Sequence, residues 1–213
     1  MRVIRWAVLL AALIGGLLMA AAPRQAIAEP EAEGALMQPG PLPEKAFGAS
    51  DAPVTVIEYA SLTCHHCKNF HVGSWPTIKE RYVDTGKVRF ILREFPLDPL
   101  ATAGFMLARC SGDMKWYAVV DTLFRKDDDW AHAADPVEGL FSVMRQTGMG
   151  REAFEACLSD QKLLDAIGEI ADRGKAAGVD ATPTFFINGR KQSGVLTPEE
   201  FAAIVDPLIA DKN

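Results

Sequence analysis

The hydrophobic pattern begins, after residue 50, with a strand, a helix and a second strand. "APVTVIEYASL", residues 52–62, is β-branched and almost wholly apolar, which predicts a central strand covered on both faces. "CKNFHVGSWPTIKERYVDTG", residues 67–86, predicts a helix that ends at Gly86 and is kinked by Pro76. "KVRFILREFPL", residues 87–97, predicts the second strand. Together they form a βαβ unit with a right-handed crossover.

A different pattern follows, with apolar residues three or four positions apart. It predicts helices within residues 98–178, among them one that begins at Asp135-Pro136. Strands return around Asn188-Gly189, a dipeptide typical of a hairpin turn. Residues 197–200, "TPEE", combine an N-cap, a first-turn proline and a capping-box glutamate, and so predict the start of a last helix.

This order predicts an α/β fold whose α/β unit is interrupted by a helical insertion. We expect a first α/β part at residues 51–97, an inserted helical subdomain at 98–178 and a second α/β part at 179–213. Residues 29–50 carry four prolines and four glutamates, which is typical of an extended, poorly ordered lead-in.

Residues 1–28 have the features of a cleavable secretory signal peptide. Arg2 and Arg5 precede an apolar run, and Ala26-Ile27-Ala28 places small residues where a signal peptidase reads them, so cleavage is expected after Ala28. The alternative is an uncleaved membrane anchor, because the apolar run is almost long enough to span a bilayer.

Composition and charge narrow the functional classes. The net charge of −6 argues against nucleic acid and anionic membrane surfaces as partners. No glycine-rich phosphate loop or GxSxG motif supports nucleotide binding or serine hydrolysis. The four cysteines of an exported chain stand in a compartment where disulfides persist.

"SLTCHHCKNF", residues 61–70, carries the candidate chemistry. Cys64 and Cys67 lie where a strand gives way to a helix, whose free N–H groups and positive dipole end stabilise a thiolate. The thiolate is the nucleophile in disulfide exchange, and Cys67 is one turn away and can close the disulfide. His66 could add an imidazole dipole or a positive charge near Cys64.

Metal binding is the alternative for these residues, since His65 and His66 separate the two thiols. Structural zinc sites usually need a second pair of ligands at similar spacing. Cys110 and Cys157 are single, and the adjacent histidines could reach one ion only with strain. We therefore expect no metal and no organic cofactor.

Two blocks, "GASDAPVTVIEYASLTCHHC" and "GVDATPTFFING", resemble the signatures of the DsbA family of periplasmic thiol:disulfide oxidoreductases. The resemblance covers about Gly48 to the C-terminus and implies a thioredoxin-like fold with an inserted α-helical subdomain. It implies that Cys64 is the nucleophile, that Cys67 is the resolving thiol and that Pro183 is a cis-proline presenting backbone to the substrate.

Other positions of the resemblance bear on how oxidising the pair is. His66 matches the family's usual histidine, whereas His65 stands where the family more often has proline. Thr182, before Pro183, also occurs in reductive relatives. The resemblance further implies action on reduced, unfolded exported proteins in the periplasm, reoxidation by a DsbB-type membrane partner, and a monomer. The alternatives are a disulfide reductase or isomerase, or a metal-binding or chaperone module.

Three features outside the CxxC motif have two interpretations each. Glu58, in an apolar strand six residues before Cys64, could accept a proton from Cys67 or lie at a solvated edge. Cys110 and Cys157 could form a structural disulfide, as in some family members, or be buried free thiols; we favour the disulfide. His71 could border the site, but we expect it on the helix surface. The chain's tryptophans after the signal region, Trp75, Trp116 and Trp130, are expected in the core.

Overall fold

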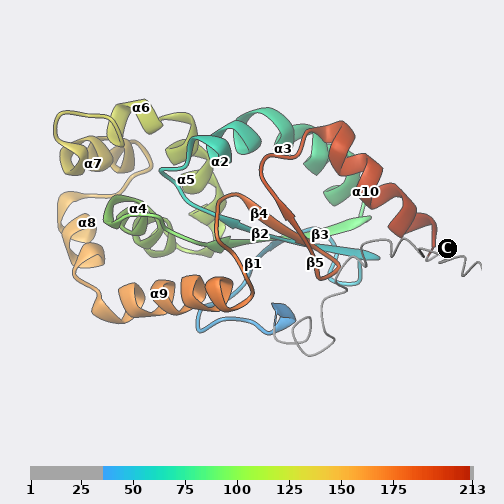
Figure 1. Cartoon of the computed structure of the whole chain (residues 1–213). Helices are drawn as coiled ribbons and strands as arrows, with labels where there is room; N and C mark the ends of the chain where they lie inside the picture. Colours follow the sequence, from blue (N-terminus) through green and yellow to red (C-terminus); the bar gives the residue numbers. More distant parts are fainter. Residues whose placement is uncertain (1–35, 212–213) are drawn as a thin grey trace, which may run out of the picture.

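The computed structural model describes residues 36–211, so the predicted signal peptide lies outside the described residues. A mixed five-stranded sheet in the order β1–β3–β2–β4–β5 forms its centre (Figure 1). Strands β2 and β3 are parallel, and the other neighbouring pairs are antiparallel. The strands are β1 (Lys45–Phe47), β2 (Val54–Ala60), β3 (Val88–Glu94), β4 (Thr184–Ile187) and β5 (Arg190–Ser193).

The predicted βαβ unit is present, and its helix is irregular. The segment between the parallel strands alternates α-helical and π-helical stretches: α2 (His65–Asn69), η1 (Phe70–Ser74), α3 (Trp75–Ile78) and η2 (Lys79–Val83). Pro76 lies in the first turn of α3. A proline cannot donate the usual helical hydrogen bond, and the wider π-helical turns before it accommodate the missing donor. Pro76 therefore lies where a π-helical stretch gives way to an α-helical one.

Helices fill the interval between β3 and β4. They are α4 (Pro99–Cys110), α5 (Asp113–Arg125), α6 (Asp127–Trp130), α7 (Pro136–Gln146), α8 (Arg151–Leu158) and α9 (Gln161–Ala176), and α10 (Pro198–Ala210) follows the hairpin. The predicted helix starts are confirmed: Asp135 accepts from two backbone N–H groups of α7, and Thr197 and Glu200 form a capping box on α10. Asn188 and Gly189, which join β4 to β5, both have positive φ, as a type I′ turn requires.

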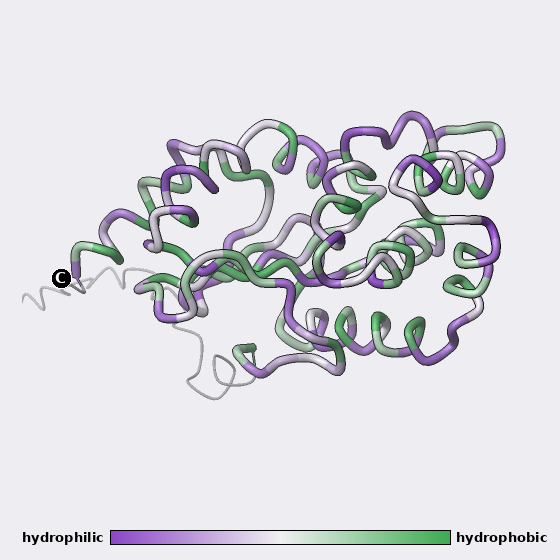
Figure 2. The backbone as a smooth tube through the Cα atoms, turned by 180° about the vertical axis from the view of Figure 1, so that it is seen from behind, coloured by the Kyte–Doolittle hydropathy of each residue, from purple (hydrophilic) through white to green (hydrophobic). Residues whose placement is uncertain are grey.

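The sheet is covered on both faces, which explains its apolar strands. In Figure 1, α2, α3 and α10 lie on one face and α9 lies on the other, while α4 to α8 gather at one end. The outer helices alternate polar and apolar positions, as amphipathic helices do (Figure 2). The three tryptophans are buried, as predicted. None of the helices within residues 36–211 is long and apolar enough to span a membrane.

Alternation along β2 decides which side chains meet the helices. Val56 and Ala60 belong to the core on the α2 side, whereas Ile57 and Tyr59 belong to the core on the opposite face. Because successive residues of a strand point to opposite faces, Glu58 falls on the α2 side with Val56 and Ala60. This carboxyl group therefore lies under the helix that carries the CxxC motif.

The end of the predicted lead-in is part of the fold. Lys45–Phe47 pair with β3 as strand β1, a strand that the hydrophobic pattern does not predict. The buried side chain of Arg93 binds the residues that precede β1. Its guanidinium donates to the carbonyl oxygens of Leu36 and Gln38 and to the carboxylate of Glu44. A proline-rich segment is thus held by cation-to-backbone hydrogen bonds rather than by a long strand.

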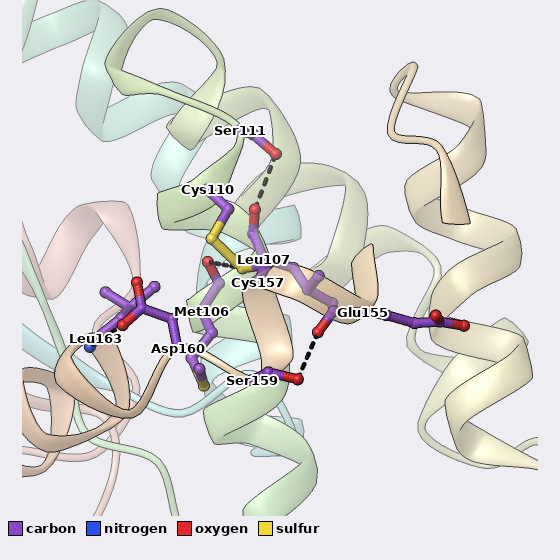
Figure 3. Close-up of a disulfide and its surroundings, with 9 residues drawn as sticks. All are labelled: Met106, Leu107, Cys110, Ser111, Glu155, Cys157, Ser159, Asp160 and Leu163. Atoms are coloured by element: carbon purple, nitrogen blue, oxygen red, sulfur yellow. Dashed lines mark hydrogen bonds between the residues drawn. A yellow bond between two sulfur atoms is a disulfide. The ribbon is translucent and has the colours of Figure 1, made fainter. Parts of the chain in front are cut away.

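A disulfide links two helices of the insertion. Cys110 at the end of α4 is bonded to Cys157 of α8, with the two Cα atoms 6.1 Å apart (Figure 3). Cys157 is buried and Cys110 is exposed. The bond joins residues 47 positions apart in the sequence.

Replacing Cys110 and Cys157 with alanine is expected to lower the free energy of unfolding by about 4 kcal/mol, because a cross-link over a loop of this length limits the unfolded chain. Urea denaturation of both proteins, with Cys64 and Cys67 oxidised in each, would measure the difference. An unchanged midpoint and slope would contradict the prediction.

Candidate active site

Cys64 stands where the sequence analysis expects it, at the junction of β2 and α2. It is the N-cap residue of α2, in extended backbone conformation, and its N–H donates to the carbonyl oxygen of Ser61. The strand ends at Ala60, so a tight turn brings Cys64 to the edge of the sheet, where its side chain is partly exposed. A thiolate at this position faces the N–H groups of the first helical turn.

The surroundings of Cys64 favour the thiolate. Its pKa is lowered to about 5, chiefly by the hydrogen bond from the Cys67 thiol; partial burial opposes this, and Thr182 and the backbone N–H groups of Cys67 and His66 add to it. A Cys64 thiol donates to the carbonyl oxygen of Thr182 at 3.3 Å. The lowered pKa makes Cys64 the more readily ionised thiol of the pair.

Cys67 has the opposite character. It is fully buried, and its pKa is raised well above the usual value by burial, by its hydrogen bond to Cys64 and by the negative charge of Glu58. Both cysteines are free thiols in this structure, which is the reduced state of the pair. In such a pair one thiol is ionised and can attack a disulfide, whereas the other must first lose its proton.

Pro183 and Thr182 complete the site from the far end of the sequence. The Thr182–Pro183 peptide bond is cis, as the resemblance implies, and it leads directly into β4. The Thr182 hydroxyl is buried and has no hydrogen-bond partner among the described residues. It is available to a thiolate at Cys64, and this explains its contribution to the lowered pKa of that thiol.

His65 and His66 are both exposed, with ring centroids 6.2 Å apart. His66 acts on Cys64 through its backbone N–H rather than through any ring contact that the described structure records. Within residues 36–211, the one group of three candidate metal ligands, Asp127, Asp128 and His132, lies outside the CxxC motif.

Lys68, four residues after Cys64, forms ion pairs with the two aspartates of that group. Its ammonium group contacts Asp127 directly and lies 3.5 Å from Asp128. Asp127 is buried, whereas Asp128 beside it is exposed. The ion pair therefore ties the helix carrying the CxxC motif to the insertion.

Glu58 and His71 form a buried pair beside Cys67. Their side chains are 0% and 1% exposed, and Glu58 Oε2 lies 2.9 Å from His71 Nε2. Glu58 is therefore not at a solvated edge, and the expectation that His71 lies on the helix surface is wrong. His71 lies four residues beyond Cys67, one helical turn further along the same face. That spacing, taken together with the burial of Cys67, is the signal from which the burial of His71 could have been predicted.

The Cys64 side chain is partly exposed at the protein surface. Two surface hollows of about 370 and 300 Å³ share Pro43 and Asp113 near the start of α5, and neither includes Cys64 or Cys67.

Comparison with known proteins agrees with this geometry. The sequence profile of the thioredoxin family matches residues 42–207. A Rickettsia bellii protein named as a protein-disulfide oxidoreductase is 31% identical over 171 residues, which cover 78% of this chain and 65% of that protein. The chain thus spans slightly less than two thirds of that relative's length.

Solved structures give the same result. The crystal structure of alpha-DsbA1 from Wolbachia pipientis is 32% identical, covers 83% of this chain and 95% of that one, and has a TM-score of 0.74. Oxidised BdbD from Bacillus subtilis, at 22% identity and a TM-score of 0.62 over 78% of this chain and 93% of that one, shares the fold. The chain therefore belongs to the thioredoxin family and, within it, to the DsbA-like proteins.

Proposed function

We propose that this protein is a thiol:disulfide oxidoreductase that donates a Cys64–Cys67 disulfide to reduced, unfolded exported proteins. The observation that carries the proposal is the opposite character of the two thiols: the pKa of Cys64 is lowered to about 5 and that of Cys67 is raised. Stabilising one thiolate favours the reduced pair, which makes the disulfide form an oxidant. Membership of the DsbA-like proteins supports the same reaction.

The reaction begins with the oxidised pair. A substrate thiolate attacks the Cys64 sulfur, the bond to Cys67 breaks, and Cys67 leaves as a thiolate that takes up a proton. The substrate is now held on Cys64 as a mixed disulfide. A second thiolate of the substrate attacks the substrate sulfur that is bonded to Cys64, and Cys64 leaves as the stabilised thiolate. The substrate has lost two electrons and the enzyme has gained them.

The remaining site residues support this reaction in assigned roles. Pro183 and the backbone of Thr182 present a surface to the substrate chain next to Cys64. His66 and His65, exposed at the start of α2, adjust the stability of the thiolate. Glu58 accepts the proton that Cys67 must lose when the disulfide forms again. No organic cofactor or metal takes part in these steps.

The setting of the reaction is also a proposal. The signal peptide, with cleavage after Ala28, would place the protein in the periplasm. There it would act as a monomer, and a DsbB-type membrane partner would restore the disulfide. The acidic net charge supports protein rather than nucleic acid as the partner.

Equilibrium with glutathione tests the proposed function directly. We expect the Cys64–Cys67 pair to have a reduction potential less negative than about −200 mV, because the thiolate of Cys64 stabilises the reduced form. The measurement uses acid quenching, alkylation and mass spectrometry across a series of reduced-to-oxidised glutathione ratios. The variant with alanine at 110 and 157 identifies the titrating pair. A potential near about −270 mV, in the thioredoxin range, would contradict a role as an oxidase.

A further inference from the structure

The buried Glu58–His71 pair carries an inference that rests on the proposed function and goes beyond it. One hydrogen bond joins the two groups, and among the described residues Glu58 Oε1 and His71 Nδ1 have no partner. A buried polar atom without a partner is costly, so the pair needs an explanation.

The proton positions can be argued from those two unpartnered atoms. If His71 carries its proton on Nε2 and Glu58 is a carboxylate, only lone pairs are left unpaired. A protonated Nδ1, in either a neutral or a charged ring, would be a buried N–H without an acceptor, which is rarer in proteins than an unpaired acceptor. A charge-assisted bond from Nε2–H to the carboxylate is also the stronger one.

The rest of the environment fixes the ring of His71. It stacks on Phe124 with centroids 4.5 Å apart and meets Phe70 edge-on at 5.4 Å. The residues paired with Glu58 on the neighbouring strands, Leu92 and Phe185, are apolar. The titratable groups that sense the charge of Glu58 are Cys67 and Tyr117. His71 is therefore the one polar side chain for which the described structure gives Glu58 a hydrogen bond.

We propose that His71 is a positioning residue for disulfide formation: its Nε2–H holds Glu58 Oε2 and leaves Oε1 as the atom that receives the Cys67 proton. In this step the S–H bond of Cys67 breaks, the proton moves to Oε1, and the carboxylate becomes a carboxylic acid. The Cys67 thiolate then attacks the Cys64 sulfur of a mixed disulfide and displaces the other thiolate. Proton transfer also removes the negative charge that opposes ionisation of Cys67.

Oxidised glutathione serves as the test disulfide. The Cys64 thiolate forms a mixed disulfide with one glutathione and releases the other, and Cys67 then resolves it. Rapid acid quenching and mass spectrometry near pH 7 measure the resolving step in the wild type, Glu58→Gln, His71→Phe and the double variant. We expect resolution to slow at least tenfold in Glu58→Gln and about tenfold in His71→Phe, as for loss of a general base and of its orienting group. In the Glu58→Gln background, His71→Phe should have no further effect.

Two more variants sharpen the result. His71→Gln keeps an N–H donor and should recover most of the resolving rate. His132→Phe removes an exposed imidazole instead and should leave the rate unchanged. A slowing by His71→Phe that is equal in both backgrounds would overturn the inference, because the effect would then not pass through Glu58. An unchanged rate in Glu58→Gln or in His71→Phe would also overturn it.

Failure of the proposed function looks different: the wild type itself would then not exchange with glutathione. Should His71→Phe not fold, the unsubstituted protein still decides the matter. A long-range proton–nitrogen NMR spectrum of the reduced form must show His71 protonated on Nε2. A proton on Nδ1 alone would overturn the inference, since Nε2 could then not donate to Glu58.

Discussion

Replacing Cys64 with serine is expected to abolish disulfide transfer, whereas replacing Cys67 with serine is expected to stop the reaction at the mixed disulfide. A hydroxyl at 64 is neither ionised nor able to form a disulfide, so the oxidation of a reduced dithiol protein should fall by at least about a thousandfold. With Cys67→Ser, the Cys64 thiolate is still partly exposed and still attacks, but no second thiol releases the bound substrate.

The two serine variants control for each other, because each removes one sulfur from the same turn of helix. Incubation with a small disulfide, followed by non-reducing mass spectrometry, would show an adduct on Cys64 of the Cys67→Ser variant. It would show none on Cys67 of the Cys64→Ser variant. Adducts on both variants would mean that Cys67 is also an accessible nucleophile. That result would contradict its burial and its raised pKa.

Alkylation of the reduced protein is expected to show a Cys64 pKa near 5. The rate with iodoacetamide should reach half its maximum near that pH and be almost constant above about pH 6.5, where an ordinary thiol, with a pKa of about 8.5, is still mostly protonated. The same variants give the control, since Cys64→Ser should remain unreactive over this range. A midpoint between pH 8 and 9 would contradict the stabilisation of the thiolate by Cys67 and Thr182.

The lowered pKa also links pH to stability. Because the folded-state pKa of Cys64 is depressed, its contribution is complete above the unfolded-state value and is lost as the pH falls through about 5. At pH 7 the reduced form should gain on the order of 1 to 2 kcal/mol from this group, because solvent screening of the partly exposed thiolate reduces the full effect; the oxidised form, which has no free Cys64 thiol, gains none. The raised pKa of Cys67 has no effect at this pH, since Cys67 is protonated in both folded and unfolded chains.

Denaturation of both redox forms at pH 4.5 and pH 7 would measure this gap. Carboxylates and histidines common to both forms largely cancel in the difference. An equal difference between the two forms at both pH values would contradict the linkage.

Much of the fold could be predicted from the sequence because local rules and tertiary packing agree there. The β2–helix–β3 unit, the Asn188-Gly189 hairpin and the capped starts of α7 and α10 each follow from residues close together in the chain. Strand β1 could not be predicted in this way, because three residues carry too little pattern and the pairing with β3 is non-local.

The candidate site divides along the same line. Cys64 and Cys67 are recognised by spacing, and the cis bond at Pro183 by resemblance to a family motif. The partner of Glu58 was missed, because the pairing joins a strand to a helix thirteen residues later and depends on how η1 turns its side chains. A histidine in an otherwise ordinary helical run gives no signal of this kind until the burial of Cys67 is taken into account.

Because the two thiols differ in pKa, the net charge of the enzyme depends on its redox state. At neutral pH the reduced protein carries one more negative charge than the oxidised protein, and that charge lies on a partly exposed sulfur at the N-terminus of α2. A cationic protein surface would bind the reduced form more tightly than the oxidised form, and its affinity would fall once the disulfide has formed again. The reduced and oxidised forms therefore differ in charge at the N-terminus of α2.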